Sequence, residues 1–188
     1  MKRIAALMVA CLLLTVCVAS FAEEDAPQSH ILVVYFSATG TTRGVAEKLA
    51  EGLSADLYEI VPEEPYTDAD LNWNDRKSRT SIETDDPTCR PAIAGELPDL
   101  TAYDTIFIGY PIWWGDVPRI VSNFAENVDL KDKTLAVFFT SGSSGLGSSM
   151  RHLEQQAGAG NWLEGKRFTN RTPVEELVNW AKSLGIEP

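Results

Sequence analysis

"ILVVYFSATGTTRG", residues 31–44, is the stretch that decides the fold of this chain. Its first part, ILVVYF (31–36), is apolar or aromatic throughout, which is typical of a strand covered on both faces of a parallel sheet. Its second part is small and rich in hydroxyl groups, and consists of Ser37, Ala38, Thr39, Gly40, Thr41 and Thr42. Because these residues cannot form a core, they either make an ordinary turn with a helix cap or hold an anion.

A loop that leaves a strand and enters a helix is suited to anions. The first turn of the helix offers free backbone N–H groups and a partial positive charge. Hydroxyl groups such as that of Ser37 could add donors, and Gly40 lets the backbone approach a ligand closely. The loop then predicts a phosphate site without lysine or arginine. The simpler interpretation is that Thr41 or Thr42 caps the helix, and the loop alone leaves both open.

Apolar and amphipathic runs alternate along the rest of the chain. A helical stripe follows the opening loop and consists of Val45, Ala46, Leu49, Ala50 and Leu53. We expect strands at residues 31–36, 56–61, 104–109, 134–140 and 167–169, and further helices at residues 118–128 and 147–157 and after residue 172. This alternation predicts an α/β fold, with a doubly wound five-stranded parallel sheet and helices on both faces.

Two local predictions complete the fold. Residues 62–100 are too many for a loop between a strand and a helix, which typically has about 2–6 residues, so we expect a helix near residues 68–80 that wraps the domain edge. The last helix is expected to begin at Thr172 as its cap, with Pro173 in the first turn and Glu175 completing a capping box.

The first residues are typical of a signal peptide. Residues 1–22 have a basic start, a short apolar middle and small residues at the end, and residues 23–29 are expected to form a flexible leader to a domain at 30–188. An uncleaved anchor is the alternative, but the apolar part is shorter than the roughly 20 residues of a bilayer span. A lipobox-like sequence before Cys17 is a further option. We expect export to the periplasm or another extracytoplasmic place, with no membrane span after cleavage.

Charge and cysteine content exclude several classes of function. The formal net charge is −11, and it becomes −13 without residues 1–22, which contain two basic residues and no acidic one. Such a domain repels nucleic acids and acidic membranes. After cleavage Cys89 is the one remaining cysteine, so an internal disulfide and a cysteine-based zinc or iron–sulfur site are excluded. We expect His30 and His152 to be surface residues.

Known nucleotide and hydrolase motifs are missing. The sequence contains no G-x-x-x-x-G-K-[ST] phosphate loop, no G-x-G-x-x-G after the first strand and no G-x-S-x-G nucleophile elbow. Two further loops follow predicted strands, however: GYPIWWGDVP (109–118) and TSGSSGLGSS (140–149). Trp113 and Trp114 either divide between core and surface or form an aromatic wall for a flat ligand. All three loops are expected to meet at the carboxyl edge of the sheet.

At this point the chain resembles flavodoxins. Residues 37–42 resemble the S/T-x-T-G-x-T phosphate loop of that family, and the order of elements resembles its 2-1-3-4-5 sheet. The PIWWGDVP and TSGSSGLG loops and residues 65–79 resemble a flavodoxin-like subgroup. The resemblance covers nearly the whole predicted domain, and three loops in order after three strands are much more specific than one.

The resemblance implies FMN as cofactor. By it, the phosphate would be held by Ser37, Thr39, Gly40, Thr41 and Thr42, with Ala38 in the same loop. The isoalloxazine would be flanked by Pro111, Ile112, Trp113, Trp114 and Gly115, and its pyrimidine end would meet Ser141, Gly142 and Ser143. Many flavodoxins have Asn at the position of Thr41 and a stacking Tyr in the third loop, which this chain lacks. The outer flavin face is therefore open or covered by Tyr66 or Trp73.

Three functions remain open. An FMN-binding electron-transfer protein is favoured, because no acid–base or nucleophile set is evident and a flavin supplies redox chemistry itself. Its partner would be a redox protein with a basic face. The second is an FMN-dependent NAD(P)H or quinone oxidoreductase with a small-molecule substrate, for which NADPH would need a basic patch of Arg76, Arg79 or Arg90. The third is a cofactor-free flavodoxin-like module of the cell envelope.

Overall fold

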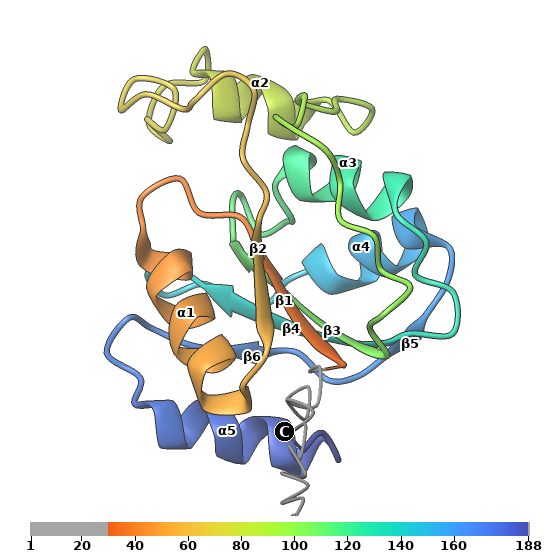
Figure 1. Cartoon of the computed structure of the whole chain (residues 1–188). Helices are drawn as coiled ribbons and strands as arrows, with labels where there is room; N and C mark the ends of the chain where they lie inside the picture. The colour runs from red at the N-terminus through yellow and green to blue at the C-terminus, as the bar shows by residue number, and fades with distance from the viewer. Residues whose placement is uncertain (1–29, 188) are drawn as a thin grey trace, which may run out of the picture.

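The computed structural model describes residues 30–187 as a parallel sheet with helices on both faces (Figure 1). The predicted signal peptide (1–22) and leader (23–29) lie outside the described residues and stay predictions. The strands are β1 (Ile31–Tyr35), β2 (Asp56–Glu59), β3 (Thr105–Pro111), β4 (Thr134–Thr140), β5 (Asn161–Trp162) and β6 (Lys166–Arg167). The helices are α1 (Thr41–Leu53), α2 (Arg79–Asp85), α3 (Arg119–Asn127), α4 (Ser149–Ala157) and α5 (Val174–Ser183).

The strand order is β2-β1-β3-β4-β5, and every pairing in the sheet is parallel. This order confirms the predicted doubly wound fold of the flavodoxin type. The expected strand at residues 167–169 is wrong in its extent, because the edge position is shared by two short pieces. The start of β4 pairs with β5, and Phe138 and Phe139 of the same strand pair with β6.

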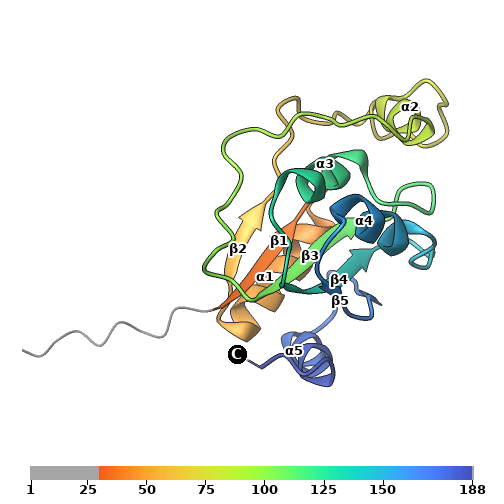
Figure 2. The same cartoon turned by 90° about the vertical axis from the view of Figure 1, so that its right-hand side faces the viewer.

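Alternate residues of β1 enter two separate cores. Leu32 and Val34 pack in the cluster that holds α3 and α4, whereas Ile31 and Val33 pack in the cluster that holds α1 and α5. The side view shows the two helical layers on opposite faces of the sheet (Figure 2). The hydrophobic run at the start of the domain is thus explained by burial on both sides.

A glycine in β3 makes room for an aromatic ring of β4. Gly109 is the register partner of Phe138, and a Cβ added at Gly109 would lie 2.0 Å from the phenyl ring. Phe138 is fully buried. This contact packs β3 tightly against β4 near the carboxyl ends of the two strands.

The expected helix at residues 68–80 is wrong, because that segment forms successive turns and α2 begins only at Arg79. Short polar side chains take the local N–H groups: Asp70 accepts from the Thr67 N–H at 2.9 Å, and Asp75 accepts from the Lys77 N–H at 2.8 Å. Such bonds compete with helical ones. Ser78 then caps α2 by accepting from the Ser81 N–H.

The predicted cap of the last helix is also wrong. Thr172 does not cap α5; its Oγ1 accepts from the Thr169 N–H at 3.1 Å and closes the preceding loop. Pro173 occupies the cap position instead, and the helix begins at Val174. No helix within residues 30–187 is long and apolar enough to cross a membrane.

The two edges of the sheet differ in what surrounds them. The segment around α2 lies over the carboxyl ends of β1 and β3 and is closed at its base by the antiparallel bridge between Pro62 and Ile93 (Figure 1). At the amino edge, β1 begins at Ile31, which belongs to the same core cluster as Ile186. The carboxyl edge therefore carries the loops and their cover.

Candidate functional site

The loop between β1 and α1 leaves the first turn of the helix without a side-chain cap. Gly40 occupies the N-cap position with a φ of +84° and offers no side-chain acceptor. The capping interpretation of Thr41 and Thr42 is therefore wrong. The buried Thr42 hydroxyl instead shares a 2.8 Å hydrogen bond with the hydroxyl of Thr140, at the end of β4. An uncapped helix start is the geometry expected of an anion site.

Ser37 has the clearest sign of a missing partner. Its Oγ is buried and makes no hydrogen bond in the described structure. A buried polar group in that state costs about 1–3 kcal/mol, and native proteins contain few of them. Ser37 is among the residues that line a cavity at the carboxyl edge, so a ligand in that cavity could supply the missing acceptor.

This cavity, which we call the cleft, has a volume of about 590 Å³. All three loops expected from the sequence contribute to it. The predicted residues that line it are Ser37, Ala38, Thr39, Thr42, Pro111, Ile112, Trp113, Trp114, Gly142 and Ser143. Leu71, Trp73, Thr80 and Ser144 complete the lining. Among the other predicted residues, Thr41 and Ser141 line an adjacent cavity, and Gly115 lies at the contact between the second and third loops.

The second loop is a tight hairpin. Trp113 and Asp116 exchange two backbone hydrogen bonds of 3.1 and 2.9 Å, and the residues between them, Trp114 and Gly115, have φ values of +49° and +75°. Both values suit a two-residue turn with left-handed backbone, in which Gly is favoured and Trp is strained. The carbonyl oxygen of Gly115 also accepts from the Ser148 N–H at 3.3 Å, which joins the second loop to the third.

The two indole rings have different surroundings. Trp113 packs edge-on against Phe36 and Tyr66, with ring centroids 5.4 and 5.3 Å apart. Trp114 is 45% exposed. One ring therefore rests on the core and the other faces outward, yet both line the cleft. The structural and the ligand-binding interpretations of this pair are compatible.

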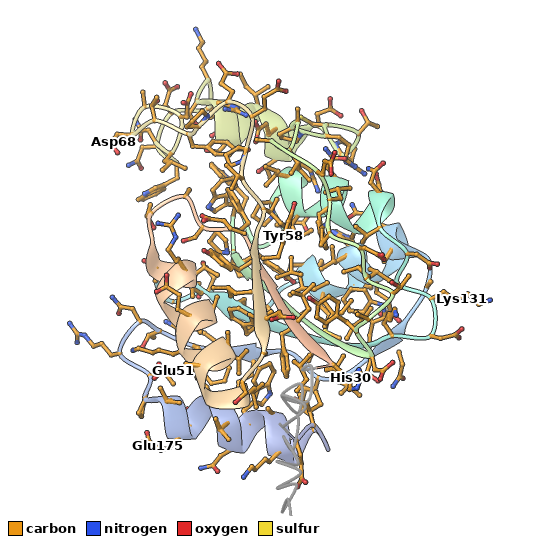
Figure 3. The ribbon with its side chains drawn as sticks, viewed as in Figure 1. His30, Glu51, Tyr58, Asp68, Lys131 and Glu175 are labelled. Carbon is orange, nitrogen blue, oxygen red and sulfur yellow. The ribbon has the colours of Figure 1, made fainter. Side chains whose placement is uncertain are left out.

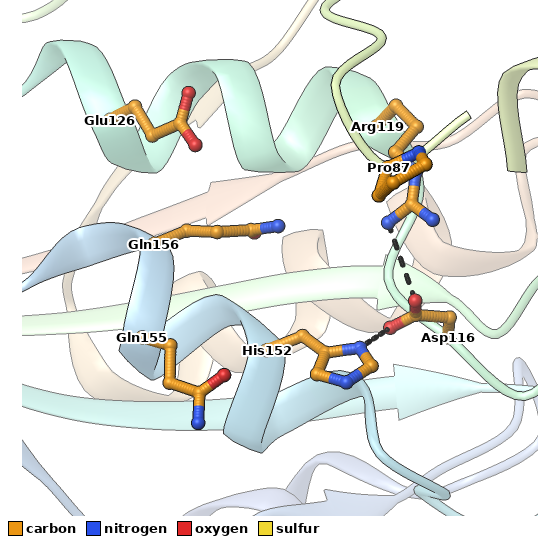
Figure 4. Close-up of a pocket in the computed structure, with 7 residues that line it drawn as sticks. All are labelled: Pro87, Asp116, Arg119, Glu126, His152, Gln155 and Gln156. Atoms are coloured by element: carbon orange, nitrogen blue, oxygen red, sulfur yellow. Dashed lines mark hydrogen bonds and ion pairs between the residues drawn. The ribbon is translucent and has the colours of Figure 1, made fainter.

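A partly buried cluster of Asp116, Arg119 and His152 holds the hairpin in place (Figure 4). Asp116 contacts His152 Nδ1 at 2.9 Å with one carboxylate oxygen and Arg119 at 3.3 Å with the other. Arg119 is 7% exposed and also donates to the carbonyl oxygens of Glu83 and Thr84 in α2. His152, which we expected on the surface, is half-buried by this contact. The cluster fixes the hairpin to α2, α3 and α4.

Residues 62–80 supply a cover for the cleft. Trp73 is 73% exposed and lines the cleft, so it is the candidate for covering a bound ring. Tyr66 has a supporting role: its hydroxyl donates to Glu83 at 2.7 Å, and the Arg79 guanidinium lies 4.1 Å from its ring centroid. Burial, reinforced by the Glu83 carboxylate, raises the pKa of Tyr66 and keeps it neutral.

Two of the three arginines considered for a basic patch are neutralised. Arg79 pairs with Glu83 at 2.6 Å, and Arg90 pairs with Glu126 at 2.6 Å. Sequence reasoning missed a different basic group, which consists of Arg167 at the end of β6 and Arg171 in the segment that follows. They line a second cavity beside the cleft. The rule that parallel strands end at one edge could have found them, because RFTNR (167–171) follows the last strand.

The sheet order and the cleft at the carboxyl edge define a flavodoxin-like α/β protein. A family profile described as flavodoxin matches residues 30–184. The chain belongs to the flavodoxin family. Among curated proteins, none matches this chain.

Solved structures resemble the chain over most of its length. A candidate flavoprotein from Bacteroides eggerthii is 46% identical, with a TM-score of 0.79, over 84% of this chain and 98% of that one. Another, from Bacteroides uniformis, is 42% identical, with a TM-score of 0.78, over 82% and 99%. A flavoprotein from Lactobacillus acidophilus, determined in complex with FMN, is 26% identical, with a TM-score of 0.60, over 73% and 91%.

Proposed function

We propose that this protein binds FMN in the cleft and transfers electrons to and from a partner. The observation that carries the proposal is the buried, unpartnered Ser37 hydroxyl beside an uncapped helix start. A phosphate group is a suitable acceptor for both. The FMN-bound flavoprotein from Lactobacillus acidophilus, which is similar over 73% of this chain, adds support.

The residues present fit FMN. The loop of residues 37–42 would hold the phosphate through the Ser37 hydroxyl and the first-turn N–H groups of α1. Trp113 and Trp114 would shield the isoalloxazine from water, while Gly142 and Ser143 in the third loop would meet its pyrimidine end. When bound, FMN supplies one- or two-electron redox chemistry, and the protein contributes binding, orientation and electrostatics.

Charge favours a protein partner with a basic face. The chain carries a formal net charge of −11, which steers a positively charged surface toward it and repels nucleic acid. Within residues 30–187 no group of three His, Cys, Asp or Glu residues is placed to hold a metal ion. An electron carrier needs neither a metal nor an acid–base pair, because the flavin performs the redox step.

A flavin-dependent quinone or NAD(P)H oxidoreductase is the second candidate. It is favoured by the third loop, which has no aromatic residue and leaves one wall of the cleft to Gly142, Ser143 and Ser144. A small substrate could then reach the flavin face. The pairing of Arg79 and Arg90 with carboxylates weakens the case for NADPH at the patch considered from sequence. A module without cofactor is the third candidate.

The place of action follows from the first residues. We propose export and cleavage after Ala22, which puts the mature protein in the periplasm or another extracytoplasmic place. Intact-mass measurement of protein purified from its own host tests this. A mass that includes residues 1–22 would contradict cleavage, and a mass that indicates acylated Cys17 would identify a lipoprotein instead.

Titration of apoprotein with FMN tests the proposed function. We expect flavin fluorescence to be quenched at micromolar protein and a flavin absorption spectrum to remain after gel filtration. Steady-state oxidation of NAD(P)H, with and without a quinone, separates the candidates: a carrier shows almost none without a reductase. Unquenched fluorescence and flavin-free protein from the native host would contradict FMN binding and favour the cofactor-free module.

A further inference from the structure

Beside the cleft lies a second cavity of about 650 Å³, which we call the arginine pocket. Its walls come from the phosphate loop, through Thr39 and Thr41, from the end of β6, through Arg167, and from the segment after β6, through Asn170 and Arg171. The two cavities share residues of all three loops that line the cleft, including Thr39, Trp113 and Gly142. They are therefore neighbouring parts of one carboxyl-edge depression.

The arginine pocket is basic in a strongly acidic protein. Its lining contains both arginines and no Asp or Glu, although the chain has 27 acidic and 16 basic residues. Within residues 30–187 neither arginine forms a salt bridge with a carboxylate. Most other arginines of the described chain, including Arg43, Arg79, Arg90 and Arg119, have such a partner. Within the described residues, no carboxylate therefore neutralises either guanidinium of this pocket.

The pocket is also preorganised. One terminal nitrogen of Arg167 donates to the carbonyl oxygens of Ser141 and Gly142 at 2.9 and 2.8 Å, which holds the guanidinium against the third loop. The following segment is fixed from α1, because Lys48 donates to the carbonyl oxygen of Asn170 at 2.7 Å. The pocket therefore has one positioned guanidinium, Arg167, and one exposed guanidinium, Arg171, on a segment tied to α1.

We propose that Arg167 and Arg171 form a phosphate-binding subsite next to the cleft, which supplements the neutral donors of the phosphate loop. Guanidinium groups bind phosphate oxygens through paired N–H donors, and the helix start at Thr41 adds positive potential on the same side. The proposal deepens the proposed function and rests on it for the flavin. The phosphate is either that of FMN itself or that of a second molecule bound beside the flavin.

Binding measurements with matched variants separate these sources. We would measure dissociation constants for FMN and riboflavin with the unmodified protein, R171Q, the double variant R167Q/R171Q and the control K131Q. Lys131 precedes β4, at the amino edge, and projects outward from the molecule (Figure 3), and it lines neither the cleft nor the arginine pocket. K131Q therefore removes one positive charge without touching the subsite. Calorimetry with inorganic phosphate, on apoprotein and on FMN-loaded protein, completes the set.

If the subsite takes the flavin phosphate, R171Q weakens FMN binding about 3- to 10-fold and leaves riboflavin binding within twofold. The double variant R167Q/R171Q then weakens FMN binding further. If it takes the phosphate of a second molecule, FMN binding is unchanged and binding of inorganic phosphate to FMN-loaded protein is lost in the double variant. Either result supports the subsite. The subsite is overturned if the dissociation constants for FMN and for inorganic phosphate are the same in R171Q, R167Q/R171Q and K131Q.

Failure of the proposed function gives a different pattern. Unmodified protein that binds neither FMN nor riboflavin would contradict the flavin site, while inorganic phosphate on apoprotein would still test the subsite. The subsite would be supported if apoprotein bound inorganic phosphate, R171Q abolished this binding and K131Q retained it. The subsite would be overturned if the unmodified protein bound no phosphate. Thermal unfolding of all variants checks that the exposed substitutions leave the fold unchanged.

Discussion

Ser37 shows how a binding site can cost stability. Its hydroxyl is buried without a partner at the point where the chain leaves β1. Ser122 in α3 also has a buried, unpartnered hydroxyl, but it is not among the residues that line the cleft. The two serines therefore share an energetic defect and differ in whether a ligand could relieve it.

Replacing Ser37 with alanine is expected to have opposite effects on stability and on binding. S37A removes an unsatisfied group, so the free energy of unfolding of apoprotein should stay level or rise by about 1 kcal/mol. FMN affinity should fall about tenfold, because a donor to a charged phosphate oxygen is lost. Urea unfolding and fluorescence titration measure the two effects.

The matched control is S122A. It should change the stability of apoprotein in the same direction and leave FMN affinity unchanged. If S37A and S122A weakened FMN binding equally, the hydroxyl of Ser37 would have no direct role toward the phosphate.

The roles of single residues could be predicted from the sequence only where their partners are close in the chain. The hydroxyl-rich loop was recognised as either an anion site or a cap, and the sequence left both open. The structure excludes the cap because Gly40 occupies the N-cap position, and the Thr42 hydroxyl bonds instead to Thr140, 98 positions away. Such a contact depends on how β1 and β4 are arranged in space, and this arrangement cannot be read from a short stretch of sequence. The same is true of His152, whose partner Asp116 is 36 positions away.

At the scale of elements, β3 and β4 are held together by complementary sizes. Gly109 leaves space that the Phe138 ring fills, so the pair acts as one packing unit near the ends of the two strands that carry the second and third loops. The backbone of Gly109 needs no left-handed conformation. The requirement for glycine at this position is therefore purely steric.

G109A is expected to destabilise the protein by about 2–3 kcal/mol, because the new methyl group overlaps the ring. Shortening the neighbour should relieve the overlap, so the double variant G109A/F138L should lose less than the sum of its single variants. G44A in α1 is the contrasting glycine: nothing lies within 4 Å of its added Cβ, and we expect about 0.5–1 kcal/mol of stabilisation. Strictly additive urea-unfolding energies for Gly109 and Phe138 would contradict the steric explanation.

Long periodic elements were predictable and short polar ones were not. The strands at the centre of the sheet and α1 follow from burial, which leaves a strong hydrophobic pattern. The segment at 68–78 was misjudged because Asp70, Asn72 and Asp75 bond to nearby backbone N–H groups and hold turns where a helix was expected. Between the two short edge strands the chain passes close to β4: at Gly165 a Cβ would lie 3.2 Å from the Val137 carbonyl oxygen, a contact that no local sequence pattern contains.

At the scale of the whole molecule, all five tyrosines are held neutral. Desolvation is the largest cause in each case, and it raises the pKa of Tyr35, Tyr58, Tyr66, Tyr103 and Tyr110 above the ordinary value of 10.0. For Tyr103, burial and the nearby Asp56 carboxylate raise the pKa to about 12. The hydroxyl of Tyr103 donates to Asp56 at 2.7 Å, which links the start of β2 to the turn before β3.

These shifts predict a loss of stability in alkali. A phenol whose pKa is higher in the folded state than in the unfolded state stabilises the fold fully below pH 10, and the contribution is lost as pH rises through 12. The free energy of unfolding should therefore fall steadily over this window. Phenolate absorbance of folded protein should also appear at higher pH than that of protein in urea. Y103F should flatten part of the decline, and coincident titrations of folded and unfolded protein would contradict the prediction.

The position of the first and last described residues has a practical consequence. β1 begins at the amino edge, where Ile31 belongs to the same core cluster as Ile186, while both cavities open at the carboxyl edge. A tag or fusion joined directly at residue 30 or residue 187, the first and last described residues, would therefore attach on the side of the molecule away from both cavities (Figure 1). When the protein is fixed to an electrode or a sensor chip in this way, its cofactor face points into solution, and the face stays accessible to docking molecules without any redesign of the loops.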